Sequence, residues 1–418
     1  MIPLPSDMIS PSDAARLARR GCRVLIAGGP SEPIALLDAV AADPDLWQDL
    51  CLTGAFVPGV NTRDYSALGR NTRVETIFTT AALAASSATG RVDHLPLHYS
   101  DFWSRIARPG IIDIAYAAVP PPAPDGTVGL GLSADFLPAA EAAGAMLVGV
   151  VSQAMPDLSG APRLPLSRFA VLADGGNTSP ATLPDPGTDT VSDAIAGHIA
   201  GLIPEGGTLQ LGLGRLQTAI LRRLVRDRRR DLGYHAGMIS PAVIEAREVF
   251  SRGVTTGVAL GDASFYERLR DAQAISLKPV GYTHALGTLD AIPGFVAVNS
   301  AFEVDLTGQV NAESLGGAQT SGLGGLADFL RGARASPGGL AVIALSSTTR
   351  DGRQSRIVPR LASGTIVSAS RSDIDIVVTE HGIADLRDAG LATRADRLRA
   401  IADPAFRGAT RRGRTDCE

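Results

Sequence analysis

The segment CRVLIAGGPSEPIALLDAV, residues 22–40, has the pattern of a buried strand, a tight turn and a helix. Its first part, CRVLI, is a short aliphatic run without polar alternation, which is typical of a strand covered on both faces. Gly-Gly-Pro then ends the strand, and Ile34, Leu37 and Val40 recur at helical spacing. A strand that leads directly into a helix predicts a parallel sheet with crossover helices.

The same pattern continues along the chain. IIDIAYAAV at 111–119 and AMLVGVVSQAMP at 145–156 predict further buried strands, and TLQLGLG, FVAVNSAFEVDL, LAVIALSS and IDIVVTEHG predict strands in the second half. Residues 155–190 are rich in Pro, Gly, Ser and Asp, which is the composition of a domain boundary. We therefore expect an α/β protein with two domains, residues 1–185 and 186–418.

The overall composition favours small-molecule chemistry. A net charge of -4 over 418 residues gives no field that would recruit nucleic acid or a membrane surface. There is no run of 18 apolar residues and no basic head followed by an apolar stretch at the N-terminus, so no membrane span or export signal is expected. Cys22, Cys51 and Cys417 lack paired spacing, which argues against disulfides and zinc sites and fits a reducing cytoplasm.

Two glycine-rich turns are candidate ligand loops. TLQLGLGRLQTAIL (208–221) predicts a strand, a Gly-x-Gly turn and a helix, and SGLGGLADFLRGA (321–333) places three glycines before an amphipathic helix. Backbone N–H groups in such turns can approach an anionic or carbonyl oxygen. The first turn lacks the third glycine of a dinucleotide fingerprint and the lysine of a P-loop, which argues against NAD and ATP. A plain tight turn and a flexible connector remain the structural alternatives.

Carboxylates gather in NSAFEVDLTGQVNAES (299–314), which alternates like a half-buried hairpin with Thr-Gly at its turn. Glu303, Asp305 and Glu313 could act there as acid or base, or could accept backbone N–H groups and brace the turn. Glu380 and His381 follow a predicted strand, where capping roles are equally common.

In their order along the chain, these segments resemble the acetyl-CoA hydrolase/transferase family, in the branch similar to 4-hydroxybutyrate CoA-transferase. The similarity extends from about residue 20 to residue 408 and includes LQLGLG, FVAVNSAFEVDLTGQVNAES, SGLGGLADFLRGA, SRIVP, VVTEHGIADLR and a closing IADPAFR. It implies two open-sheet α/β domains of CoA-transferase type with the active site in the cleft between them. It also implies coenzyme A, bound as the acyl-CoA substrate, no metal, and a homodimer.

The resemblance further implies which residues contact CoA. They are the residues of the two glycine turns and one asparagine: Leu211, Gly212, Leu213, Gly214, Arg215, Asn299, Ser321, Gly322, Leu323, Gly324 and Gly325.

One segment departs from the family pattern at its chemical centre. Family members have LGxHxEM, whose glutamate attacks the acyl-CoA and forms a glutamyl-CoA thioester, whereas this chain has LGYHAGM. The position of that glutamate is thus Gly237, while His235 is retained. A glycine offers no nucleophile, and it leaves space for water or for part of an acyl group.

Four mechanisms remain open. We expect hydrolysis or acyl transfer by direct attack, with His235 as general base and glycine-loop amides holding the oxyanion. Alternatively, Glu303 or Glu313 has taken over as the nucleophile of a covalent CoA-transferase, with a bulkier acyl chain admitted beside Gly237. The chemistry could also have changed, for example to decarboxylation of an acyl-CoA. Finally, the chain could bind acyl-CoA without catalysis.

Overall fold

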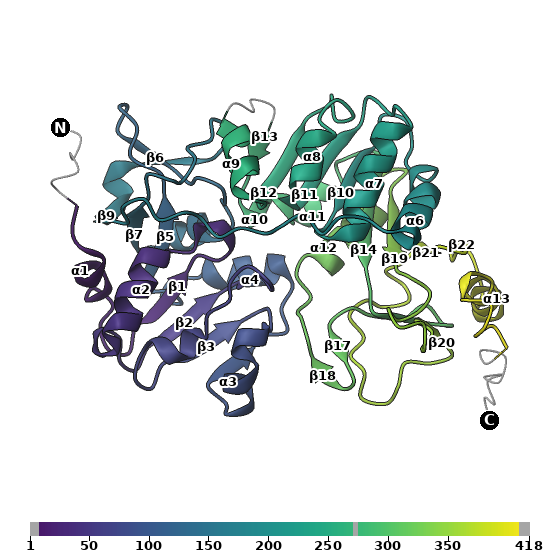
Figure 1. The fold of residues 1–418 in the computed structure, drawn as a ribbon, viewed down its shortest axis with the longest axis horizontal. Helices are drawn as coiled ribbons and strands as arrows, with labels where there is room; N and C mark the ends of the chain where they lie inside the picture. The colour runs from purple at the N-terminus through teal and green to yellow at the C-terminus, as the bar shows by residue number, and fades with distance from the viewer. Residues whose placement is uncertain (1–7, 271–274, 409–418) are drawn as a thin grey trace. The chain divides into compact units, whose positions relative to one another are not determined.

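The computed structural model describes residues 8–270 and 275–408, so Cys417 and the first seven residues lie outside the described part. The chain divides into two compact units. The first unit is Met1–Pro184 with Thr255–Thr283, and the second unit is Asp185–Val254 with His284–Glu418. Figure 1 labels many of the elements of both units. Within the described residues, no helix has the length and apolar character needed to cross a membrane.

The first unit contains a seven-stranded parallel sheet. Its strands, in spatial order, are β4 (Val92–His94), β3 (Arg73–Thr76), β2 (Cys51–Gly54), β1 (Arg23–Ile26), β5 (Ile114–Val119), β7 (Met146–Val151) and β9 (Phe169–Asp174). Val24 of β1 pairs with Leu52 on one side and with Ile114 on the other. The chain therefore leaves β1 in one direction through β2 to β4 and in the other through β5 to β9. This change of direction is the topological switch point of the sheet.

Within residues 8–184, the first unit contains the helices α1 (Pro11–Ala15), α2 (Ile34–Ala42), α3 (Ala84–Ala88), α4 (Tyr99–Ile106) and α5 (Leu137–Ala142). α2 buries Leu36, Leu37 and Val40 against Val24 of β1 and its neighbours. The strand, turn and helix expected over residues 22–40 are thus confirmed.

The first unit also includes a segment from later in the chain. It holds most of β12 (Val254–Ala259), then α9 (Ala263–Arg270), β13 (Ile275–Leu277) and α10 (Val280–Thr283). The Leu277 N–H donates to the Gly160 carbonyl at 2.8 Å, and the Ala134 N–H donates to the Gly257 carbonyl at 3.0 Å. The compact units therefore do not follow the chain order of the predicted domains 1–185 and 186–418, which stay a prediction.

The second unit contains strands of a mainly parallel sheet. Six of its strands occur in the order β11 (Gly233–Ile239), β10 (Thr208–Leu211), β14 (Phe295–Ser300), β19 (Leu340–Ala344), β21 (Ile376–Thr379) and β22 (Gly382–Asp385), with β22 antiparallel. β10 pairs with β11 and with β14, so the switch point of this unit lies beside β10. The sequence prediction of an α/β protein with parallel sheets is confirmed in both units.

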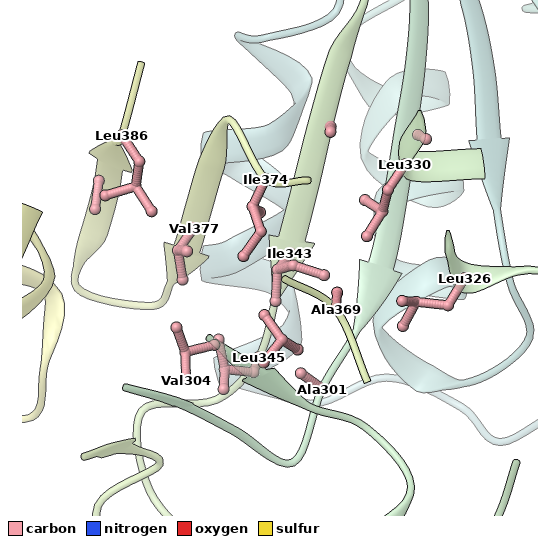
Figure 2. Packing of buried hydrophobic residues seen from close by; sticks show 14 of the residues in the cluster. Ala301, Val304, Leu326, Leu330, Ile343, Leu345, Ala369, Ile374, Val377 and Leu386 are labelled. Carbon is pink, nitrogen blue, oxygen red and sulfur yellow. The ribbon is translucent and has the colours of Figure 1, made fainter. Parts of the chain in front are cut away.

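Helix α12 (Leu326–Ala335) covers β14 and β19 of this sheet. Leu326 and Leu330 of the helix belong to the same buried cluster as Ile343 of β19 and Val377 of β21, and Figure 2 shows these side chains together. The remaining helices are α6 (Thr190–Ala200), α7 (Arg215–Arg226), α8 (Pro241–Glu245), α11 (Leu286–Leu289) and α13 (Leu391–Ile401). The aliphatic face of α12 thereby fixes the start of the helix, and with it the second glycine turn, against the sheet.

The carboxylate-rich segment forms the expected hairpin. β15 (Glu303–Asp305) and β16 (Val310–Asn311) pair antiparallel, and β15 also pairs with β20 (Ile357–Val358). A second small hairpin, β17 (Ser314–Leu315) with β18 (Ala318–Gln319), follows. In the first unit, β6 (Thr127–Gly129) and β8 (Arg163–Pro165) form a similar pair.

Candidate functional site

The first glycine turn lies at the switch point of the second unit. It follows β10 directly, and Leu211 at the end of β10 pairs with Val298 of β14. Asn299, the next residue of β14, donates from its side-chain amide to the Gln210 Oε1 at 3.1 Å. A Cβ added to Gly212 would meet no atom within 4 Å, so the backbone there is open to an approaching group. The fold thus brings Gly212 and Asn299 together at the carboxyl ends of neighbouring strands, where α/β proteins bind ligands.

Gly214 begins the helix that follows this turn. It is the N-cap of α7 and has φ of 131°, a conformation that favours glycine. The first-turn N–H groups of the 12-residue helix α7 carry its partial positive charge toward this sheet edge. The Arg215 guanidinium is engaged at the surface in an ion pair with Asp189 at 2.9 Å. Backbone N–H groups, rather than the Arg215 side chain, are therefore the donors this turn presents.

The second glycine turn, Ser321–Gly325, leads into α12, with Gly325 as its N-cap. Gly324 has φ of 54°, in the left-handed region. A Cβ on Gly325 would lie 2.5 Å from Nε2 of His284 and 2.8 Å from Cε2 of Phe329. Glycine is needed at 325 because the His284 and Phe329 rings lie directly against its backbone.

His235 and Gly237 lie on the same face of β11, two residues apart. His235 is only 4% exposed, and its ring meets the edge of Phe295 with centroids 6.1 Å apart. A Cβ on Gly237 would lie 3.1 Å from Cε1 and 3.2 Å from Nε2 of His284, with Phe329 next at 3.9 Å. The space expected to be open to water or an acyl group is instead occupied by an imidazole.

His284 is the site residue that the sequence analysis missed. It is 3% exposed, and its ring packs on Phe329 with centroids 4.6 Å apart. Burial, and secondarily the nearby His235, lowers the pKa of His284 to about 3, so the ring is neutral near pH 7. No motif or periodicity in the surrounding KPVGYTHALG singles it out. We call His235, Gly237, His284, Gly325 and Phe329 the histidine cluster.

The candidate carboxylates are held by their own hairpins. Glu303 accepts a hydrogen bond from the Asn311 amide at 3.1 Å. Asp305 accepts the Thr307 N–H at 2.9 Å and braces the turn. Glu313 is 4% exposed and accepts from the Ser368 hydroxyl at 3.2 Å. The atoms nearest to a Cβ at 237 belong to His284 and Phe329, not to any of these carboxylates.

The strand-end pair that the sequence analysis also considered is similarly engaged. Glu380 accepts from both the N–H and the hydroxyl of Ser347, at 2.9 and 2.6 Å. His381 lies 3.8 Å from Glu380 and 3.7 Å from Asp403. In the part of the chain that the structure describes, no group of three or more His, Cys, Asp or Glu side chains is arranged to hold a metal ion.

Comparison with known proteins identifies two matching family models. The model for the acetyl-CoA hydrolase/transferase N-terminal domain matches residues 3–167, and the model for the C-terminal domain of the same family matches residues 261–412. The 4-hydroxybutyrate coenzyme A transferase of Clostridium kluyveri is 31% identical over 397 residues, which is 92% of each chain. The butyryl-CoA:acetate CoA-transferase of Anaerostipes caccae is 33% identical, covering 76% of this chain and 73% of that one. The crystal structure of RipA from Yersinia pestis superposes with a TM-score of 0.90 at 27% identity, covering 98% of this chain and 97% of that one.

Proposed function

This chain belongs to the acetyl-CoA hydrolase/transferase family and is an enzyme acting on acyl-CoA, and from this premise we propose that it hydrolyses or transfers the acyl group by direct attack. On this proposal no glutamyl-CoA intermediate forms. The observation that carries it is the imidazole of His284, 3.1 Å from where the Cβ of residue 237 would be. A ring at that position excludes the carboxylate that a covalent route through residue 237 would need.

The proposal assigns CoA to the glycine turns of the second unit. It is supported by the open backbone at Gly212, the positive φ of Gly214 and the start of α7, where the described residues provide no side-chain cap hydrogen bond. Backbone N–H groups at a helix start stabilise phosphate or a developing oxyanion. Asn299 belongs to the same sheet edge and adds a side-chain amide there.

The chemical step is attack on the thioester carbonyl carbon by water or by an acceptor nucleophile. His235 takes the proton of the attacking group, the C–S bond breaks, and the proton passes to the departing CoA thiolate. His284, whose pKa near 3 makes it a poor base, is assigned as a neutral hydrogen-bond donor to the carbonyl oxygen. The neutral ring carries one N–H group, which donates to the oxyanion.

The direct test is release of free CoA thiol from acetyl-CoA and butyryl-CoA in the absence of any acceptor acid. We expect release by the parent chain and a drop of about 100-fold or more in His235→Ala, the usual scale for a general base. His198→Ala, on α6, is the matched control and should match the parent. Unchanged turnover in His235→Ala would remove the assigned base.

A second measurement separates the covalent route. After mixing with butyryl-CoA and borohydride, mass spectrometry of the whole chain should show no modified glutamate. An adduct at Glu303 or Glu313 would replace this proposal with that of a covalent CoA-transferase. Binding of CoA without thiol release or transfer would identify a non-catalytic acyl-CoA-binding protein instead.

A further inference from the structure

An open groove in the first unit lies along the amino ends of its strands and plays no part in the proposed function. Its volume is about 1210 Å³, more than the roughly 300–1000 Å³ of an ordinary small-molecule pocket. β1, β2 and β3, which lie side by side in Figure 1, each contribute their first residue to its walls: Arg23, Cys51 and Arg73. Arg91, directly before β4, lines the groove too. The groove therefore has room for a ligand that contacts several strands.

The lining of this groove is positively charged. Its charged side chains are four arginines and one aspartate: Arg23, Arg70, Arg73, Arg91 and Asp49. Asp49 forms an ion pair with Arg20 and accepts from the Asn71 amide at 3.0 Å, so its charge is already compensated. The whole chain, by contrast, carries a net charge of -4. A concave surface with a local excess of one charge attracts ligands of the opposite charge.

Two of these arginines are neighbours that lack an acidic partner. Val74 of β3 pairs with Val92 of β4, and the Val74 N–H donates to the Arg91 carbonyl at 3.0 Å, so Arg73 and Arg91 follow each other across adjacent strands. Arg73 is exposed, and its guanidinium forms no ion pair or hydrogen bond with another residue that the structure describes. Arg91 donates to the carbonyl of Ser66, which is a neutral group. Adjacent strands are about 4.8 Å apart, so these two like charges repel unless an anion binds between them.

The other two arginines carry charge that is only partly compensated. Arg70 lies 3.1 Å from Asp45, but 73% and 61% of the two side chains are exposed, and such surface pairs are weak. Arg23 lies 3.3 Å from Glu75, and Glu75 also pairs with Arg105 at 2.5 Å. One carboxylate is thus shared between two guanidinium groups, which leaves positive charge at this end of the groove as well.

We propose that this groove binds a polyphosphate anion, a nucleoside triphosphate or inorganic polyphosphate, with Arg73 and Arg91 donating to one phosphate group and Arg23 and Arg70 donating to the next. The guanidinium group presents parallel N–H donors that match two phosphate oxygens, and it remains charged at every physiological pH. Arg23 and Arg73 begin strands that are separated by β2, so their backbones are about 10 Å apart, a spacing that linked phosphates can follow. This assignment does not rest on the proposed function, because the groove belongs to the first unit and CoA is assigned to the second.

The test is equilibrium dialysis of inorganic triphosphate and of ATP against the full chain, with sulfate as the single-anion comparison. We expect triphosphate to bind with a Kd below about 1 mM and at least about tenfold more tightly than sulfate. Its affinity should fall as NaCl is raised from about 0.05 M to about 0.3 M, because salt screens exposed charges. Tighter binding of ATP than of triphosphate would identify a nucleotide as the ligand, and equal binding would identify the phosphate chain alone.

Arginine variants locate the bound anion. Arg73→Gln and Arg91→Gln should each weaken triphosphate binding about tenfold or more, since each removes a charged donor. Arg73→Gln breaks no contact with the described residues, so it tests binding even where Arg91→Gln suffers from the loss of its bond to Ser66. Arg16→Gln, which removes an exposed arginine of the same unit outside the groove, is the matched control and should bind as the parent does.

Three results would overturn the assignment. Unchanged binding in Arg73→Gln and Arg91→Gln, each shown to be folded by its thermal transition, would mean that the anion binds elsewhere in the chain. Equal affinity for triphosphate and sulfate would reduce the groove to a site of general charge attraction. An affinity that does not change with NaCl concentration would exclude the exposed arginines as the binding groups.

Discussion

Replacing Gly237 with glutamate tests whether the imidazole of His284 excludes a carboxylate from this position. The added Cβ would begin 3.1 Å from Cε1 and 3.2 Å from Nε2 of His284, and the remaining side-chain atoms would extend into the ring. Overpacking of this kind costs about 1–3 kcal/mol, and a buried unpaired carboxylate costs a similar amount again. We therefore expect Gly237→Glu to lower the free energy of unfolding by about 2–6 kcal/mol.

Removing the His284 imidazole should reduce the destabilisation caused by Gly237→Glu. In Gly237→Glu combined with His284→Ala, the truncated side chain vacates the space that the glutamate needs, and we expect a favourable coupling free energy of about 1–3 kcal/mol. Urea unfolding of the parent, both single variants and the double variant measures this coupling. Gly237→Ala adds only the Cβ and should stay within about 1 kcal/mol of the parent. Single-variant effects that simply add, within about 0.5 kcal/mol, would refute the steric argument.

Further predictions concern the neighbouring glycine and the two shifted pKa values. Gly325→Ala should lose about 1–3 kcal/mol of unfolding free energy in urea because its Cβ would lie 2.5 Å from His284, whereas Gly212→Ala, which meets no atom within 4 Å, should stay within about 1 kcal/mol of the parent. His284 has a pKa of about 3 against 6.5 for the free group, so between these pH values the unfolded chain binds a proton that the folded chain does not. The free energy of unfolding of the parent should therefore fall by up to about 1.4 kcal/mol per pH unit as the pH falls from 6.5 toward 3. His284→Gln should lack this pH dependence. Asp135 changes the free energy of unfolding in the opposite direction, because its pKa is raised from 3.8 to about 7. Its contribution to stability is full at low pH and is lost as the pH rises to 7. Asp135→Asn should remove that decline in stability. Urea titrations between pH 4 and 7 check both signs, and identical slopes in the variants and the parent would contradict them.

The sequence predicts most of the fold because the deciding signals are local. The strand, turn and helix of residues 22–40 each depend on neighbours within a few positions, and the structure has β1 at Arg23–Ile26 and α2 at Ile34–Ala42. The hairpin around Asp305 follows from its alternation and its Thr-Gly turn in the same way. The return of Thr255–Thr283 to the first unit is not local, since it depends on hydrogen bonds to backbone more than a hundred positions earlier in the chain.

In the candidate site, too, the features set by local sequence could be predicted and those set by tertiary contacts could not. The glycine turns are visible in sequence because a turn before a helix has a fixed residue pattern, and Gly212 indeed follows β10 directly. The neighbour of Gly237 is not visible in the sequence, because His284 lies between α10 and α11, far along the chain from β11, and meets Gly237 only in the folded structure. The Oδ1 of Asp135, which has no hydrogen-bond partner among the described residues, is equally hidden from the sequence, since the lack of a partner depends on the three-dimensional surroundings.

The glycines at 237 and 325 have one physical cause in this fold. Each borders the same imidazole, at 3.1 Å and 2.5 Å from where its Cβ would be, so a side chain at either position competes with His284 for the same volume. An imidazole with a pKa of about 3 is a weak nucleophile, and because the ring is neutral near pH 7 it adds no negative charge next to a developing oxyanion. On the proposed function, the residues around His284 thus stabilise a transition state and do not form a covalent intermediate. A covalent intermediate would require both a glutamate at position 237 and removal of the His284 ring. We therefore expect the double variant, and not Gly237→Glu alone, to form an adduct with acyl-CoA that borohydride can trap.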